Sequence, residues 1–315
     1  SGGGGANVAA QVTFASLGTD LGGSVRLPGT FCGVVGLKQT FGRVSQRGLM
    51  VTSFNGDHIG PMTRSVADAA LMQNVMSGPH PEDICTLPNR VRLPEDYDGI
   101  EGWKIAYSPD LGYVEIDPEV KRNTESAVAK FESLGCTVDR VELDWNWGVL
   151  DCWMTWWEGL FAAVAGEFLP RWRYEMDPYV VRLLENGLGH SAARLYSCNT
   201  FRGEMWRALQ PILKRYDVLI CPTLAVPAVK ADHDDADPDY RINGKRIQAY
   251  VGWVLTHGFN LVSQCPVMSV PTGHAANGVP TGMQIVARPF DDHRVFQAAT
   301  AFEAAAPWRG KRPDI

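Results

Sequence analysis

The sequence predicts an α/β fold in one continuous domain, residues 1–315, and three observations support this prediction. First, residues 103–107 and 136–141 are typical of strands, and a helical segment over 117–134 separates them. This order indicates a parallel βαβ unit, which is characteristic of the α/β class. Second, the apolar run at 217–223 predicts another buried strand. Third, apolar residues make up 45% of the chain and charged residues 20%, as in globular proteins that bury a sizeable core.

Capping residues predict where two helices begin and end. Thr63 fits the N-cap of a helix over 64–72, whose apolar residues have helical spacing. Asp117 fits the N-cap of the helix in the βαβ unit, because Pro118 then occupies the first helical position, where proline is favoured. Gly135 is expected to end that helix.

The middle of the chain, residues 145–216, has helical apolar spacing and no strand-like alternation, so helices are expected there. Five tryptophans lie between Trp145 and Trp157. They indicate either a hydrophobic helical layer, which is the commoner arrangement, or the aromatic wall of a substrate pocket. The pocket candidates are Trp153, Trp156 and Trp157. We expect this helical region to be an insertion or a lid.

The last third of the chain predicts two strands, at 266–271 and 282–286, and a final helix at 292–302. The acidic segment at 232–237 precedes them. Because adjacent acidic residues in a loop more often form a solvated turn than a cation site, no metal site is predicted there.

Charge and composition argue against several classes of protein. The net charge of -6 and the pI near 5.7 disfavour a nucleic-acid-binding surface, which needs clustered Lys and Arg. No stretch approaches the length of an apolar membrane span, and no secretory signal pattern is present, so no membrane partner is expected. The seven cysteines form no CxxC pair, which favours free thiols in a reducing compartment. A cytoplasmic location is therefore expected.

The glycine-rich stretch LGTDLGGSVR, residues 17–26, contains a serine that could carry chemistry. A serine hydroxyl attacks a carbonyl group when a base takes its proton and hydrogen-bond donors stabilise the oxyanion. Glycines help with the second requirement, because without Cβ they let consecutive backbone N–H groups point at one spot. Gly22 and Gly23 would supply such donors beside Ser24. By composition alone, an ordinary turn is the commoner interpretation of Gly-Gly-Ser.

Longer motifs change this interpretation. SGGGGA at 1–6 and GTDLGGSVRLP at 18–28 resemble the signature of the amidase signature family of serine hydrolases. The resemblance is specific, because small residues, an acid, a serine, an arginine and a proline stand at fixed offsets. It continues at FCGVVGLK, GPMTR, CPT, FNL, PVMSVPTG and GVPTGMQ, and it is weakest in the Trp-rich middle.

This resemblance implies an amidase-signature fold, in which helices cover both faces of a central mixed β-sheet. It implies that Ser24 is the acyl-forming nucleophile. The oxyanion hole would be lined by the backbone amides of Leu21, Gly22, Gly23 and Ser24. Polar contacts that support the loop would come from Thr19, Asp20 and Arg26. No metal or organic cofactor is implied.

The family's other two catalytic residues are a lysine and a serine held by a cis peptide bond. The family pattern puts both of them before Ser1, which matches the second serine of the family's Ser-Ser pair. Ser1 could stand in for the bridging serine only with an offset of one position. Lys38, the lysine nearest to Ser24 in the sequence, matches a different family position. We therefore expect an N-terminal segment that carries both residues and is cleaved, lies on another chain or is missing from this sequence; without it, the chain is expected to be inactive.

Two residues depart from the family pattern, and other catalytic motifs are absent. Gln39 stands where proline is common, and Gly4 stands where serine or glutamate is frequent. None of the seven histidines lies in a recognisable triad motif, and the sequence has neither a GxSxG elbow nor a GxxxxGK[ST] phosphate loop. Cys32 and Cys221 flank matched motifs, but both lie in apolar runs and are expected to pack as small hydrophobic residues.

The sequence therefore predicts an amide hydrolase that cleaves the C–N bond of a carboxamide through an acyl-enzyme on Ser24. Its products are an acid and an amine or ammonia, and the tryptophans favour an aromatic or hydrophobic small-molecule substrate. Two alternatives stay open. One is the glutamine-hydrolysing subunit of a tRNA-dependent amidotransferase, which needs partner subunits. The other is an inactive homologue used for binding. A homodimer is also compatible with the sequence.

Overall fold

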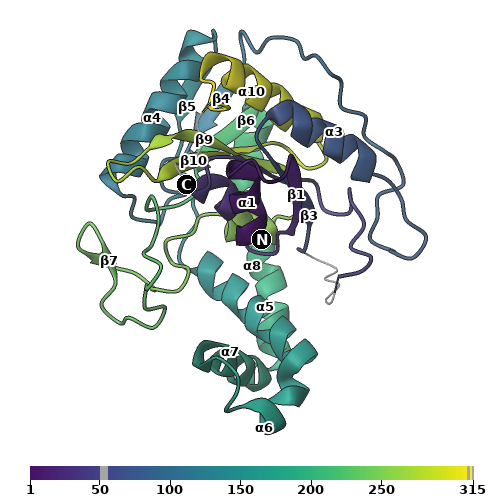
Figure 1. Ribbon diagram of the computed structural model, residues 1–315, viewed down its shortest axis with the longest axis vertical. Coiled ribbons are helices and arrows are strands. Elements are labelled where there is room, and N and C mark those ends of the chain that lie inside the picture. Colours follow the sequence, from purple (N-terminus) through teal and green to yellow (C-terminus); the bar gives the residue numbers. More distant parts are fainter. Residues whose placement is uncertain (50–55, 311–312, 314–315) are drawn as a thin grey trace.

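The computed structural model describes residues 1–49, 56–310 and 313, and one mixed β-sheet forms its centre. Within these residues the sheet has eight strands in the order β1-β3-β2-β9-β10-β6-β4-β5 (Figure 1). They are β1 Ala15–Thr19, β2 Val35–Lys38, β3 Ile59–Thr63, β4 Lys104–Tyr107, β5 Thr137–Arg140, β6 Val218–Pro222, β9 Val267–His274 and β10 Pro280–Val286. Each pair of neighbouring strands in the part β1-β3-β2-β9-β10-β6 of the sheet is antiparallel, and β4 pairs in parallel with both β6 and β5. The predicted α/β class with a mixed sheet is confirmed.

Helices cover both faces of the sheet. In β6, Val218 and Ile220 belong to one buried apolar cluster, and Leu219 and Cys221 belong to another. Since successive side chains of a strand point to opposite faces, the two clusters lie on opposite sides of the sheet. Helices α3, α4 and α10 contribute to the first cluster, and α2, α5 and α8 contribute to the second. Their bounds are α2 Arg26–Phe31, α3 Val66–Met76, α4 Pro118–Ser133, α5 Gly148–Ala165, α8 Ala192–Arg215 and α10 Asp292–Ala305.

The βαβ unit forms as predicted from β4, α4 and β5, with its two strands parallel. The Asp117 carboxylate accepts a hydrogen bond of 2.8 Å from the amide of Glu119, and Pro118 occupies the first turn of α4. Gly135 follows the helix with φ at +84°, a conformation that glycine adopts without strain. The residues at which this helix begins and ends were thus predicted correctly from the sequence.

The cap of α3 was predicted at the wrong residue. Ser65, not Thr63, is the N-cap, because its hydroxyl accepts a hydrogen bond of 3.0 Å from the amide of Asp68. Thr63 is the last residue of β3, and its hydroxyl donates to the Ser65 carbonyl oxygen at 2.7 Å. Both are good capping residues, and strand pairing decides between them because it holds Thr63 in the sheet.

The helices expected in residues 145–216 form a helical arm, residues 148–215, that extends away from the sheet (Figure 1). Helices α5 and α8 join the arm to the sheet, and its far end holds η1 Gly166–Phe168, α6 Leu169–Trp172 and α7 Pro178–Gly189. The far end has a small apolar cluster of its own around Leu169, Val181 and Leu184. No helix in the described part of the chain combines the length and the hydropathy needed to cross a bilayer.

Four short elements complete the described fold. Helix α1 and helix α9 lie near residues 20–25, which link β1 to α2, and β7 and β8 form a separate two-stranded sheet. The bounds are α1 Gly2–Ala9, α9 His257–Leu261, β7 Arg241–Ile242 and β8 Lys245–Arg246.

Candidate active site

The Gly-Ser loop, residues 20–25, links the end of β1 to the start of α2 on the sheet face that also carries α5 and α8. Ser24 lies one residue before Val25, the N-cap of α2, and its side chain is partly exposed. No group in the described residues forms a hydrogen bond with Ser24 Oγ. The loop therefore presents an accessible hydroxyl.

The carbonyl groups of this loop are turned toward the protein. Each of three consecutive carbonyl oxygens accepts one hydrogen bond, two from distant side chains and one from the first turn of α2. The bonds are Trp153 Nε1 to Leu21 O (3.0 Å), Thr256 Oγ1 to Gly22 O (2.5 Å) and the Leu27 amide to Gly23 O (2.7 Å). These contacts fix the orientation of the loop's peptide planes.

The amide N–H groups of the same loop are left unbonded. Within the described residues, no acceptor receives a hydrogen bond from the amides of Leu21, Gly22, Gly23 or Ser24. Consecutive backbone N–H groups that are held in place and have no partner form an anion-binding arrangement. The loop can thus offer several donors to a negatively charged oxygen next to the Ser24 hydroxyl.

Two glycines in the loop are required by the space around them. Gly23 has φ at +124°, where a residue with a Cβ is strained, and a Cβ there would also collide with Thr256 Oγ1. A Cβ on Gly22 would collide with the ring of Trp153. The same two side chains that anchor the loop's carbonyls therefore exclude any larger residue.

We expect the substitution Gly23→Ala to lower the free energy of unfolding by about 1–3 kcal/mol, because alanine must adopt a strained backbone conformation there. Urea unfolding followed by circular dichroism measures the change. Gly3→Ala is the matched control, since Gly3 lies inside α1 with no atom near its Cβ position. The free energy of unfolding of the control should exceed that of the parent by about 0.5–1 kcal/mol, because alanine favours the helix. A Gly23→Ala variant as stable as the parent would contradict the strain argument.

A fully buried ion pair braces the two ends of the loop. Arg26 donates to Asp20 through two hydrogen bonds, Nη2 to Oδ1 at 2.8 Å and Nε to Oδ2 at 3.0 Å. Its other N–H groups donate to Thr256 O (3.0 Å), Gln284 Oε1 (2.7 Å) and Asn260 Oδ1 (2.6 Å). The guanidinium group has five N–H donors, and this geometry gives each of them an acceptor.

The Asp20 carboxylate is occupied entirely by this bracing role. Burial by itself would raise the pKa of Asp20, but the charge and hydrogen bonds of Arg26 and a hydrogen bond from Asn260 outweigh it and hold the pKa well below its ordinary range. Asp20 Oδ2 also accepts from the amide of Val25 at 3.4 Å, across the loop. The carboxylate is thus charged at neutral pH and committed to holding the loop closed.

Two further buried titratable groups, Lys38 and His58, lie near Asp20. Lys38 Nζ donates to backbone carbonyls in the 263–265 segment, and burial followed by the charge of Arg26 lowers the pKa of Lys38 to about 7. Burial followed by the charge of Lys38 lowers the pKa of His58 to about 3. Both side chains contact backbone oxygens and each other rather than Ser24.

The three tryptophans proposed as pocket residues lie at different depths. Trp153 is buried, and its ring stacks on Trp157 and on His257 with ring centroids 5.4 Å apart in each pair. Trp156 is partly exposed and lies under the guanidinium group of Arg202, 4.7 Å from its ring centroid. Trp157 is also partly exposed. Trp153 therefore contacts the loop directly, while the other two extend the aromatic surface along α5.

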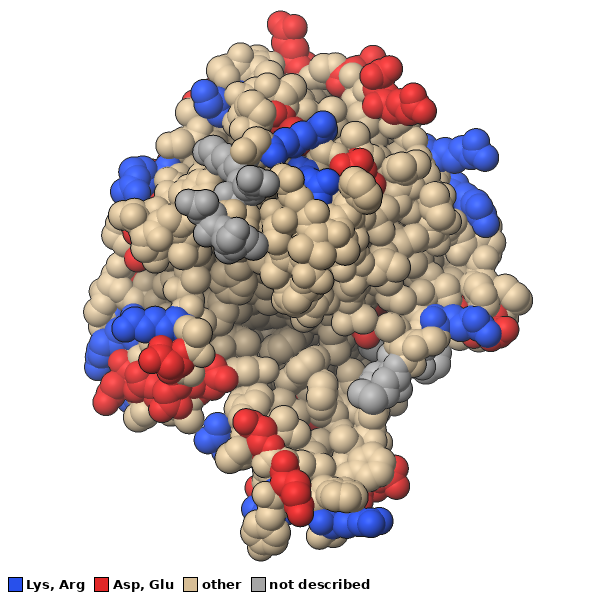
Figure 2. All heavy atoms as spheres, viewed as in Figure 1, with Lys and Arg blue, Asp and Glu red and all other residues tan. Residues whose placement is uncertain are grey.

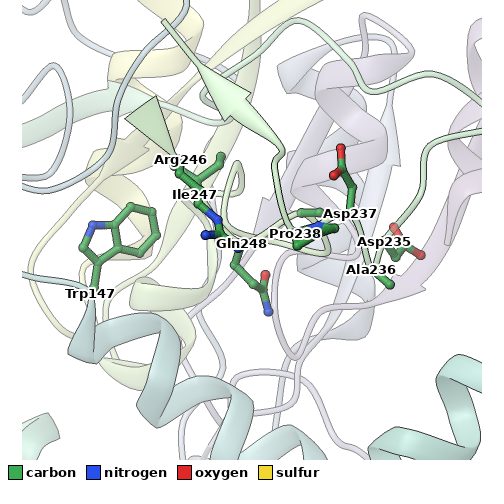
Figure 3. A pocket seen from close by; sticks show the side chains of 9 residues that line it. Trp147, Asp235, Ala236, Asp237, Pro238, Arg246, Ile247 and Gln248 are labelled. Atoms are coloured by element: carbon green, nitrogen blue, oxygen red, sulfur yellow. The ribbon is translucent and has the colours of Figure 1, made fainter. Parts of the chain in front are cut away.

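The space-filling view shows a hollow between the sheet and the helical arm, and its visible floor is mostly free of charged side chains (Figure 2). A separate cavity of about 570 Å³ lies beside the acidic segment, with Trp147 at one end and Asp235 and Asp237 at the other (Figure 3). No residue of the Gly-Ser loop lines that cavity. Among residues 1–49, 56–310 and 313, no group of three or more His, Cys, Asp or Glu side chains is placed to hold a metal ion.

The structure also brings residues to the loop that were not predicted from the sequence as site residues. These are Thr256, Asn260 and Gln284, all buried. The sequence feature that could have indicated such residues is a polar residue inside an apolar run, as for Gln284 within β10. A polar residue in such a run is expected to be buried, and a buried polar group needs a hydrogen-bond partner. That signal identifies a buried polar residue, but it does not identify its partner.

Comparison with known proteins places these motifs in a family context. Residues 1–296 match the Amidase family profile. An acylamidase of Rhodococcus erythropolis is 34% identical over 313 residues, which cover 98% of this chain and 65% of the acylamidase. A glutamyl-tRNA(Gln) amidotransferase subunit of Thermodesulfovibrio yellowstonii is 32% identical over 342 aligned positions, which cover 99% of this chain and 68% of that protein.

Solved structures of amide hydrolases are also similar to this chain. The crystal structure of a bacterial aryl acylamidase belonging to the amidase signature enzymes superposes with a TM-score of 0.86 at 26% identity, over 99% of this chain and 67% of that one. A 6-aminohexanoate cyclic dimer hydrolase superposes with a TM-score of 0.82 at 25% identity, over 99% of this chain and 68% of that one. The chain thus spans about two thirds of the length of these relatives.

Proposed function

Since the chain belongs to the amidase signature family, we propose that it is an amide hydrolase that forms an acyl-enzyme on Ser24. The observation that carries this proposal is the accessible Ser24 hydroxyl next to four consecutive unbonded amide N–H groups. A serine nucleophile and an oxyanion hole are the two parts that acyl transfer needs in one place.

The proposed reaction proceeds in two halves. Ser24 Oγ attacks the carbonyl carbon of the amide, its proton leaves to a base, and the resulting oxyanion accepts hydrogen bonds from the amides of residues 21–24. The C–N bond then breaks, and the amine or ammonia leaves with a proton. Water attacks the acyl-enzyme ester, and the acid is released with Ser24 restored. No metal or organic cofactor takes part in this scheme.

The base in this scheme follows from the family pattern. In that pattern a neutral lysine accepts the nucleophile's proton through a second serine, and both residues occupy positions before Ser1. A lysine acts as a base only when burial or nearby donors lower its pKa. Lys38 has such a lowered pKa, but its ammonium group is directed at backbone carbonyls, so we do not assign it this role.

The roles of the neighbouring residues follow from their contacts. We assign Asp20 and Arg26 to holding the loop in shape, since each is fully buried and bonded to the other. Thr19 ends β1 directly before the loop, and its backbone oxygen accepts from Ser1 Oγ at 3.4 Å, so we assign it to the same support. These groups position Ser24 and do not react.

An aromatic or hydrophobic amide is the substrate class we propose. The tryptophans on α5 and the weakly charged hollow support it, and the aryl acylamidase among the structural relatives fits the same class. Glutamine is the second candidate substrate, because glutamyl-tRNA(Gln) amidotransferase subunits are 31–34% identical to this chain, against 34% for the acylamidase. Such a subunit would act with partner subunits. The seven free cysteines support a cytoplasmic location.

Hydrolysis by the full-length protein tests this function. The substrates are acetanilide, benzamide and glutamine, and the products are aniline, ammonia and the corresponding acids. Rapid quenching followed by peptide mass spectrometry should find the acyl group of the preferred substrate on the peptide that contains Ser24. Release of ammonia from glutamine alone would favour the amidotransferase subunit. No release from any of the three, with no acyl adduct, would overturn the proposal.

A further inference from the structure

His257, the first residue of α9, lies next to two residues that anchor the Gly-Ser loop, Thr256 and Trp153. Its ring stacks on Trp153 at a centroid distance of 5.4 Å, and Trp153 in turn donates to the loop carbonyl of Leu21. The preceding residue, Thr256, anchors the loop through its hydroxyl and accepts from Arg26 through its carbonyl oxygen. Two neighbouring contacts on the loop thus fix the position of His257.

The imidazole of His257 has no protein partner for its polar atoms. The residue is 1% exposed, and Nδ1 is fully enclosed without a hydrogen-bond partner. Nε2 is not enclosed in this way, and it too has no partner among the described residues. Buried polar atoms are nearly always hydrogen-bonded, so an unpartnered ring beside a reactive loop needs an explanation.

The charge state and tautomer of this ring follow from its surroundings. Burial, followed by the charge of Arg26, lowers the pKa of His257 to about 3, so the ring is neutral at neutral pH. A neutral imidazole carries one N–H and one lone pair. Because an enclosed N–H without an acceptor is costly, the proton belongs on Nε2, the ring nitrogen that is not fully enclosed, and Nε2–H is left as a donor without a partner among the described residues.

We propose that His257 is a specificity-determining residue whose Nε2–H donates to a hydrogen-bond acceptor on the aryl part of the amide substrate. This inference rests on the proposed function and adds a substrate class to it: aryl amides that carry an ether, hydroxyl or carbonyl oxygen on or near the ring. The aromatic surface of α5 accommodates the ring itself, and His257 recognises its polar substituent. An aryl amide without an acceptor leaves the Nε2–H unpaired and binds more weakly.

Binding to a Ser24→Ala form of the full-length protein tests this inference without depending on turnover. The probes are matched pairs, methoxy- and ethyl-substituted at ring position 3 or 4, of benzamide and of acetanilide. The two substituents have similar shapes, and only methoxy offers an acceptor. Isothermal titration calorimetry should give a dissociation constant about tenfold lower for the methoxy member of at least one pair, which is the effect of one hydrogen bond.

Three variants of His257 and a control assign the preference to its ring nitrogen. His257→Phe keeps a ring against Trp153 and should abolish the methoxy preference, while His257→Gln keeps an N–H donor and should retain part of it. The control is His293→Phe, because His293 stacks on Tyr97 at 5.1 Å in another part of the molecule. It should leave the preference unchanged. Thermal unfolding of each variant verifies that it is folded, and His257→Leu, which also lacks a donor, replaces His257→Phe if that variant is not.

The outcomes separate this inference from the proposed function. A methoxy preference that disappears in His257→Phe and persists in His293→Phe supports it. Equal binding of the two members of every pair, a preference that survives His257→Phe, or no binding of any probe overturns it. Hydrolysis of the ethyl-substituted amides by the protein with Ser24 intact would still support the amide hydrolase in each of those cases.

Discussion

Replacing Ser24 by alanine should reduce amide hydrolysis by the full-length protein by about 10⁴-fold or more. Removing the nucleophile removes the whole covalent pathway, and only binding and the oxyanion hole remain to accelerate attack by water. The decrease should appear in kcat rather than in KM, because Ser24 Oγ changes its bonding during the reaction. Steady-state kinetics on the preferred substrate measures it.

The structure also predicts that Ser24→Ala will not destabilise the protein. Because Ser24 Oγ forms no hydrogen bond with the described residues, its loss should change the free energy of unfolding by no more than about 0.5 kcal/mol. Ser16→Ala is the matched control, since Ser16 lies on β1 beside the same region and has only a weak contact of 3.5 Å with Leu17 O. Its activity should equal that of the parent. An active Ser24→Ala protein, or an acyl adduct on a different residue, would show that another group is the nucleophile.

The sequence could predict this loop because its information is local. Asp20, Gly22, Gly23, Ser24 and Arg26 lie within seven positions, so the family resemblance of one short stretch implied polar contacts that support the loop. The structure shows the contact between Asp20 and Arg26 as a buried ion pair. The helix caps at Asp117 and Gly135 were predictable for the same reason, whereas Ser65 was missed because strand pairing, a long-range interaction, fixes Thr63 in the sheet. A sequence predicts a helix cap or a loop contact correctly when residues close together in the sequence determine it.

The rest of the site could not be predicted because its partners are distant in the sequence. Thr256 and Asn260 meet the loop across 234 and 240 positions, and Gln284 reaches Arg26 across 258. Apolar periodicity indicates that such residues are buried, but it contains no information on which buried groups meet. Trp153 illustrates the limit: its residue type suggested a pocket wall, but it could not indicate that the indole N–H donates to the Leu21 carbonyl oxygen of the loop, 132 positions away.

The second large effect is expected from Arg26→Met. Methionine has a similar length and no charge, so it leaves the Asp20 carboxylate buried without its counter-ion. Removing one partner of a buried ion pair costs about 3–5 kcal/mol of unfolding free energy. The acceptors on Thr256, Asn260 and Gln284 lose their donor as well. Because Thr256 anchors Gly22, activity should also fall. Urea unfolding and kinetics measure the two losses.

The pH dependence of this variant identifies the cause of the loss. In the parent, the folded-state pKa of Asp20 lies below its unfolded value of about 4, so its contribution to stability is present above that pH and is lost as the pH falls. Without Arg26, uncompensated burial raises the folded-state pKa above the unfolded value. The sign then reverses, and Arg26→Met should lose stability relative to the parent as the pH rises from 4 to 8.

The double variant Asp20→Asn, Arg26→Met separates the effect of the buried charge from the effect of the ion pair's geometry. Asparagine removes the buried charge, so the double variant should be more stable than Arg26→Met alone near pH 8 and should lack its additional pH dependence. Stability could recover in the double variant while activity does not. In that case charge neutralisation within the ion pair stabilises the fold, and the geometry of the pair holds the loop in shape. If Arg26→Met costs less than about 1 kcal/mol at pH 8, or if its cost does not depend on pH, the buried pair does not brace the loop in this way.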